Sequence, residues 1–142
     1  MENSVQLYGH QIKSDYSGHD IAFTNDLSIF GAGGDQYQPL VKGFFNTVQG
    51  CILLSAADGE ALMSHVCPNA SDWPRITDTR VLSPTGAVTV CGDSFAAWRA
   101  RMPGVLANVS SAPIPGGLTA EGVVQMARDT LRAAPGGGRQ KI

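Results

Sequence analysis

Two strand-length apolar segments flank a short turn near the middle of the chain, and this pattern constrains the fold more than any other feature. Residues 51–56 read Cys-Ile-Leu-Leu-Ser-Ala and residues 61–67 read Ala-Leu-Met-Ser-His-Val-Cys, with an Ala-Asp-Gly turn at 57–59. Short apolar runs bounded by turn residues are typical of a β-hairpin. We therefore predict an antiparallel hairpin over residues 51–67.

The register of this hairpin decides whether two reactive side chains meet. If the connection has three residues and Gly59 takes the left-handed conformation, Cys51 lies opposite His65. Directly opposed residues have β-carbons about 5 Å apart, within reach of a hydrogen bond between thiol and imidazole. A two-residue turn at Asp58-Gly59 instead pairs Cys51 with Val66 and sends the two side chains to opposite faces of the sheet.

The rest of the chain predicts strands first and helices later. The expected strands are short and rich in β-branched or aromatic residues, and they are Val5–Tyr8, Ile21–Thr24, Leu27–Phe30, Leu40–Phe45 and Val88–Cys91. One helix is expected after Asp93 or Ser94 and ends near Met102, and a second begins after the N-cap Thr119. No internal repeat is recognised. We predict an α+β fold, namely an α/β sandwich with a mostly antiparallel sheet in the first two thirds and packing helices in the last third.

Length and charge limit the classes of function. A chain of 142 residues can build one core, and we expect a single catalytic domain over residues 1–135 followed by a disordered tail over residues 136–142. The formal net charge of −2 gives no electrostatic basis for binding nucleic acid or an anionic membrane surface. Because no stretch is apolar and long enough for a secretory signal or a membrane span, we expect a soluble protein. We also expect a monomer.

Three cysteines occur in the sequence, at Cys51, Cys67 and Cys91. Their spacing fits neither a disulfide framework nor a zinc motif, so no metal and no other cofactor is expected. Reduced thiols in a cytosol are the simplest interpretation, and a bridge between Cys67 and Cys91 is left open.

Cys51 and His65 are the candidate catalytic residues. Each has a plainer interpretation, because a free cysteine in an apolar strand is usually a small buried hydrophobe and a lone histidine is more often a core or edge residue. Side by side, however, an imidazole stabilises a thiolate that can attack an amide carbonyl. His65 would then protonate the departing ammonia or amine.

Residues near this pair complete the hypothetical site. The backbone N–H groups of Gly50 and Cys51 are expected to hold the oxyanion. A third group should orient the imidazole, and we select Thr47, while Asn46, Gln49 and Thr24 are the other candidates. The polar stretch 46–49 is expected to be an exposed loop.

The two tryptophans are expected to play different roles. Trp98 shares a helical face with Phe95 and Met102 and should belong to the core. Trp73, between Asp72 and a proline in a loop, is the candidate for an exposed contact with substrate.

The cysteine and histidine segments together resemble a known superfamily. Gly50-Cys51 at a strand start and Ser64-His65-Val66-Cys67-Pro68 at the end of the next strand are similar to the cysteine glutamine deamidases, which include the chemoreceptor deamidase CheD, the cytotoxic necrotizing factor catalytic domain and Burkholderia lethal factor 1. The resemblance covers about residues 46–68. It implies an α/β sandwich that converts a glutamine, or an asparagine, side-chain amide of a protein substrate to the acid through a thioester.

The resemblance also suggests a biological setting. It implies a bacterial effector or toxin that leaves the cell without a signal peptide and acts in a host cytosol on a regulatory protein such as a small GTPase or a translation factor. A regulator in the bacterial cytoplasm is the alternative setting. Two other functions stay open: a cysteine protease or transamidase using the same pair, and a non-enzymatic binding or immunity module in which the cysteine and histidine only pack.

Overall fold

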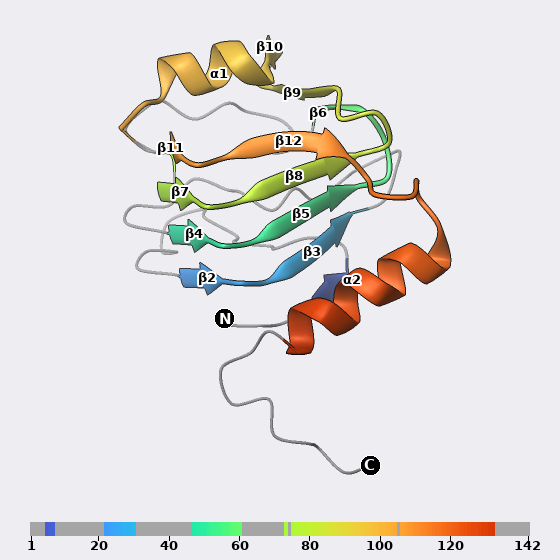
Figure 1. Ribbon diagram of the computed structural model, residues 1–142. Helices are drawn as coiled ribbons and strands as arrows, with labels where there is room; N and C mark the ends of the chain where they lie inside the picture. The colour runs from blue at the N-terminus through green and yellow to red at the C-terminus, as the bar shows by residue number, and fades with distance from the viewer. Residues whose placement is uncertain are drawn as a thin grey trace.

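A computed structural model of the chain describes residues 5–7, 22–30, 47–60, 73, 75–104 and 106–132. Within these residues most strands run parallel and form two long sheets (Figure 1). Sheet A contains β11 (Leu106–Ala107), β7 (Arg75–Thr77), β4 (Thr47–Gln49) and β2 (Ala22–Thr24), in that order. Sheet B contains β1 (Val5–Leu7), β3 (Leu27–Phe30), β5 (Ile52–Ser55), β8 (Arg80–Ser83) and β12 (Ser110–Pro113).

Within the described residues, the chain passes from sheet A to sheet B four times in the same way. Each passage, which we call a rung, consists of a sheet A strand, a two-residue corner and a sheet B strand: β2 to β3, β4 to β5, β7 to β8 and β11 to β12. The first residue of every corner has a positive φ, and these residues are Asn25 (54°), Gly50 (65°), Asp78 (52°) and Asn108 (55°). Glycine, asparagine and aspartate are the residues that enter this left-handed region most readily. The stacked rungs form a parallel β-helix, a quasi-repetitive architecture.

Hydrogen bonds continue through the corners from rung to rung. The Gly50 amide donates to the Thr77 carbonyl of the next rung at 3.0 Å, just as the Asn25 amide donates to the Gln49 carbonyl at 2.8 Å. Immediately after the corner, the Arg80 amide donates to the Cys51 carbonyl at 3.0 Å. The corners between the two sheets are therefore linked from rung to rung by backbone hydrogen bonds.

The interior between the sheets is the larger of two apolar clusters. Sheet A contributes Phe23, Val48 and Ile76, and sheet B contributes Leu53 and Val81, all at most 3% exposed. Successive side chains of a strand point to opposite faces of the sheet, so in each of these strands alternate residues face the interior.

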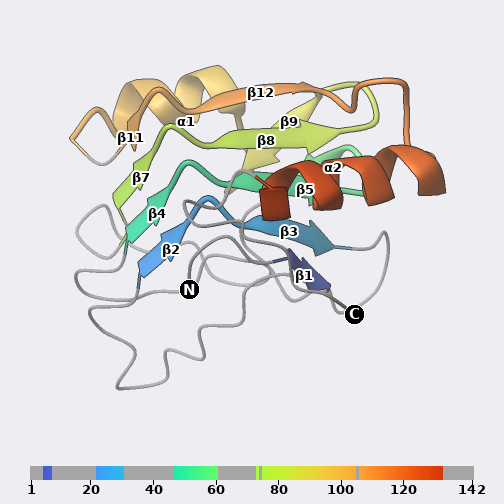
Figure 2. The ribbon, with the colours of Figure 1, turned by 60° about the horizontal axis from the view of Figure 1, so that its bottom comes forward.

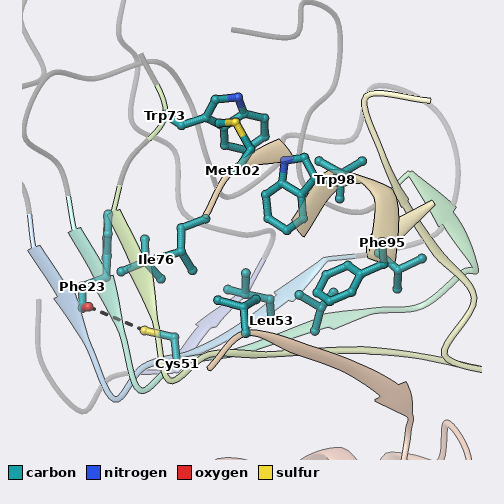
Figure 3. Close-up of a cluster of buried hydrophobic side chains, with 13 residues drawn as sticks. Phe23, Cys51, Leu53, Trp73, Ile76, Phe95, Trp98 and Met102 are labelled. Carbon is teal, nitrogen blue, oxygen red and sulfur yellow. Dashed lines mark hydrogen bonds between the residues drawn. The ribbon is translucent and has the colours of Figure 1, made fainter. Parts of the chain in front are cut away.

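A helix also packs against this interior. Helix α1 (Phe95–Arg101) buries Phe95 and Trp98 in the larger cluster (Figure 3). The hydroxyl of Ser94 caps this helix by accepting the Ala97 amide at 3.2 Å.

The outer side of sheet B is covered by the second helix, α2 (Ala120–Arg132), as Figure 2 shows. The smaller cluster joins residues of the sheet to residues of the helix, and it includes Leu27, Leu54, Leu82, Val123, Met126 and Ala127. Thr119 is the N-cap of this helix, because its hydroxyl accepts the Gly122 amide at 3.0 Å. The central strands β5 and β8 of sheet B are therefore covered on both faces, with Leu53 and Val81 on one side and Leu54 and Leu82 on the other.

A third, short sheet contains β6 (Gly59–Glu60), β9 (Val88–Val90) and β10 (Asp93–Ser94). Strands β9 and β10 form an antiparallel hairpin around Cys91 and Gly92, which both have positive φ values. Cys91 is disulfide-bonded and Cys51 is a free thiol, while Cys67 lies outside the described residues. The expectation of reduced thiols is thus wrong for Cys91.

The mixed α+β class and both helices are confirmed, but the predicted antiparallel sheet is wrong. Strand β5 pairs in parallel with β3 on one side and with β8 on the other. Both edges of β5 are occupied, so it has no free edge for a partner from residues 61–67, which lie outside the described residues. The hairpin over residues 51–67 is therefore wrong, and Gly59 instead starts β6, which pairs in parallel with β9.

Two other predictions are contradicted by the rungs, and two more fall outside the described residues. Residues 47–49 form β4 with Val48 buried, not an exposed loop. The chain has an internal repeat that was not predicted. The expected strand Leu40–Phe45 and the tail over residues 136–142 lie outside the described residues.

Candidate functional site

Cys51, the predicted nucleophile, is the second residue of the corner between β4 and β5. Its side chain points into the interior near Ile76 and Leu53 (Figure 3), and the residue is 1% exposed. The thiol donates to the Gln49 carbonyl at 3.4 Å and to the Phe23 carbonyl at 3.7 Å. The sulfur is thus bonded to the backbone inside the core and is not presented to solvent.

Both backbone groups predicted to hold an oxyanion have protein partners. The Gly50 amide donates to the Thr77 carbonyl at 3.0 Å, and the Cys51 amide donates to the Thr79 hydroxyl at 3.3 Å. An oxyanion hole requires donors aimed at the position where charge develops. Here these donors are used to join neighbouring rungs.

Burial also opposes ionisation of the Cys51 thiol. Removal from solvent, with a smaller contribution from the negative charge of Asp26, raises the pKa of Cys51 from 9.0 to about 11, although backbone hydrogen bonds with residues such as Asp26 oppose this rise. A catalytic cysteine needs a depressed pKa, because the thiolate is the attacking species. The environment of Cys51 therefore favours the neutral thiol.

The other predicted catalytic residues are not brought to the thiol in the described structure. His65 and Asn46 lie outside the described residues. Thr47 and Gln49 flank the buried Val48 in β4, so their side chains lie on the outer side of sheet A, away from the interior that contains the sulfur. Gln49 contacts the thiol through its backbone carbonyl and not through its side chain.

Thr24, a further candidate for the third group, lies in β2 directly opposite Gln49 in the parallel register. Its neighbour Phe23 points inward, so the Thr24 side chain also lies on the outer side of sheet A.

Trp73, the predicted substrate contact, belongs to the core. It is 7% exposed, and its ring packs against Trp98 with centroids 5.3 Å apart and planes at 56° (Figure 3). The prediction of an exposed tryptophan is wrong, whereas the prediction that Trp98 is a core residue is confirmed.

The residue equivalent to Cys51 in the next rung is Thr79, and the two make closely similar contacts. The Thr79 hydroxyl donates to the Thr77 carbonyl at 2.9 Å, two residues earlier, as the Cys51 thiol donates to the Gln49 carbonyl. Asp26 and Val109 occupy the same second corner position in the first and last rungs, and all four residues are at most 1% exposed. We call this set the inner corner column.

A sequence signal for this column was present but not recognised. The left-handed corner residues Asn25, Gly50, Asp78 and Asn108 follow one another at intervals of 25, 28 and 30 positions, the differences between their residue numbers. Each is followed by one buried residue and then by a sheet B strand. Repeats of 20–50 residues indicate solenoids.

A polar cluster around Asp58 joins the turn after β5 to the end of β8 and the turn that follows it. Asp58 accepts the Ser83 hydroxyl at 2.6 Å, and it also accepts both the amide and the hydroxyl of Thr85, at 3.0 and 2.8 Å. These hydrogen bonds, that of Ser83 foremost, lower the pKa of the Asp58 carboxyl. The carboxylate therefore has a structural role between rungs.

Among the residues that the structure describes, no group of three or more histidine, cysteine, aspartate or glutamate side chains could hold a metal ion. In the same part of the chain, no helix is long and apolar enough to cross a membrane. Comparison with protein-family models, with curated proteins and with solved structures finds no match to this chain.

Proposed function

We propose that this chain is a non-enzymatic binding module built on a parallel β-helix. The observation that carries the proposal is the environment of Cys51, whose sulfur is buried, hydrogen-bonded to backbone carbonyls and shifted in pKa to about 11. These properties suit a packing residue of the inner corner column.

The two long sheets offer different surfaces to a partner. The outer side of sheet B packs against α2 and is not available. On sheet A, the outward residues include Gln49 and Arg75, both exposed, and the partly exposed Thr47 and Thr77. Stacked repeats commonly bind partners along such extended surfaces. We therefore assign the outer side of sheet A to binding.

The amide-hydrolase hypothesis makes different demands on the same residue. A glutamine deamidase, a cysteine protease and a transamidase would each need a Cys51 thiolate that can reach a substrate carbonyl. Burial, the raised pKa and the engaged amides of Gly50 and Cys51 favour the binding module over all three enzymes.

A direct test compares the wild-type protein with a Cys51→Thr variant. Each is incubated with a cell lysate, and mass spectrometry maps amide-to-acid changes, cleaved peptides and amine crosslinks. We expect no modification that depends on Cys51. A modification present with the wild type and lost in a folded Cys51→Thr variant would overturn the proposal.

The proposed binding surface needs its own variants. Gln49→Ala and Arg75→Ala remove exposed side chains from the outer side of sheet A, and Arg128→Ala on the exposed side of α2 is the matched control. Quantitative crosslinking to proteins of the same lysate should lose its specific products with the first two variants only. Loss with the control alone would contradict the assignment to sheet A.

A further inference from the structure

The exposed large hydrophobic side chains in the described part of the chain gather along helix α2. They are Leu118, two residues before the helix, and Val124 and Leu131 within it, which are 46%, 45% and 52% exposed. Single exposed apolar residues are common, but several along one helix form a patch that suits a protein partner. Met126 and Ala127 pack on sheet B from another face of the helix. Helix α2 therefore has a second, partly apolar face besides the one that covers sheet B.

Two opposite charges lie on this second face. Glu121 is three residues before Val124, and Arg128 is four residues after Val124 and three before Leu131, spacings that place all four on one side of the helix. We call these four residues the α2 stripe. Glu121 and Arg128 are both exposed, and no ion pair within the described residues includes either of them. They are seven residues apart, outside the three- and four-residue spacings at which side chains of one helix pair.

The order of these residues is self-complementary. The midpoint between Glu121 and Arg128 coincides with the midpoint between Leu118 and Leu131, and it lies beside Val124. When two such helices run antiparallel and cross at this point, Glu121 of each copy lies opposite Arg128 of the other. Leu118 then lies at the level of Leu131, and the two Val124 side chains meet at the centre. A two-fold symmetric interface requires a surface that is complementary to itself in this way.

We propose that the α2 stripe joins two copies of this chain in an antiparallel, two-fold symmetric dimer, in place of the monomer expected from the sequence. The charges select the antiparallel direction, because a parallel pair would place Glu121 opposite Glu121 and Arg128 opposite Arg128. One short helix per copy is a small interface, so association requires a raised protein concentration. The proposal is independent of the binding surface on sheet A.

Charge exchange tests the dimer. By sedimentation equilibrium of the purified protein from micromolar to millimolar concentration, we expect the mass to rise from that of one chain, 14.9 kDa, toward twice that value. Glu121→Arg and Arg128→Glu each place like charges opposite one another and should weaken association at least about tenfold. The double variant Glu121→Arg/Arg128→Glu restores opposite charges and should associate as wild type does. Arg99→Glu, at an exposed residue of α1, is the matched control and should also associate as wild type does.

Leu131→Gln tests the apolar contact without a change of charge. It should weaken association while circular dichroism shows a folded protein, and it replaces any charge variant that does not fold. A wild type that stays monomeric at every concentration, or a folded double variant that associates no better than the single variants, would overturn the proposal. Gln49→Ala and Arg75→Ala should leave the mass unchanged, so failure of the dimer and failure of binding by sheet A are separate results. The lysate experiment counts crosslinks to other proteins only, so Arg128→Ala remains a control there.

Discussion

The corners at Cys51 and Thr79 perform the same task with different atoms. In each corner, a buried side chain donates to the carbonyl two residues earlier, at 3.4 Å from sulfur and 2.9 Å from oxygen. Each of these carbonyls also accepts the left-handed corner amide of the preceding rung. The difference teaches that a buried thiol beside a glycine can be a requirement of the corner geometry rather than a sign of catalysis.

The first residues of these two corners, Gly50 and Asp78, contact neighbouring rungs differently. Asp78 accepts the side-chain amide of Asn108 from the next rung at 2.9 Å. Gly50 has no side chain, and a β-carbon there would overlap the side-chain oxygen of Asn25 in the rung before. Asp78 is thus hydrogen-bonded to the corner of the next rung, whereas Gly50 leaves room for the Asn25 side chain of the rung before.

The largest expected loss of stability comes from a substitution at Thr79. Thr79→Val removes the hydroxyl that accepts the Cys51 amide and leaves that buried donor unsatisfied, which predicts a loss of about 1–3 kcal/mol in the free energy of unfolding. Urea unfolding measures it. Thr79→Ser keeps the hydroxyl and should lose clearly less. Equal losses for the two variants would show that the hydroxyl does not support the corner.

The next effect concerns the Gly50 corner. Gly50→Ala forces a side chain into the left-handed region at φ 65° and displaces the Asn25 side chain, which predicts a destabilisation of about 1–2 kcal/mol. Gly104→Ala is the control, because a β-carbon there meets no atom within 4 Å. Thermal and urea unfolding should separate the two variants, and equal stability would contradict the corner assignment.

A smaller effect is expected when one corner is given the residue of the other. Cys51→Thr retains a donor toward the Gln49 carbonyl, so its stability should stay within about 1 kcal/mol of wild type, the usual net value of one hydrogen bond. Cys51→Val lacks the donor and should be less stable than Cys51→Thr in the same urea titration. The reverse order would break the equivalence of the two corners.

Ionisation of the Cys51 thiol has the smallest effect on stability at neutral pH, and its effect is measurable only in alkaline solution. Because folding raises the pKa of Cys51 from 9.0 to about 11, its contribution to stability is complete below pH 9 and is lost as the pH rises through about 11. Cys51→Thr cannot ionise there and should lose less stability over this window. Parallel curves for the two proteins would mean that the thiol titrates as it does in the unfolded chain.

Local features were predictable from the sequence. The cap Thr119 was identified and Ser94 was one of two candidates for the other cap, because each cap depends on a side chain bonding within its own first turn. The strand Leu27–Phe30 was also correct, since short apolar runs with turn residues at both ends carry their own signal.

Strand pairing and the site were not predictable in the same way. The turn at Asp58-Gly59 has the composition of a hairpin turn, but here it leads to a different sheet, where Gly59 pairs with Val88. Pairing direction depends on residues about 25–30 positions away, which only a repeat search would have connected. Trp73 was misplaced for a similar reason, since its burial comes from Trp98, which is distant in sequence.

Site-specific alkylation of Cys51 is the most direct test of its structural role. Iodoacetamide is added to the folded protein near neutral pH, and labelling of the Cys51 peptide is followed by mass spectrometry with increasing urea. Because the thiol is 1% exposed and its pKa is about 11, we predict negligible labelling of the native protein and rapid labelling only across the unfolding transition. Labelling of native Cys51 as fast as that of the unfolded chain would contradict the account.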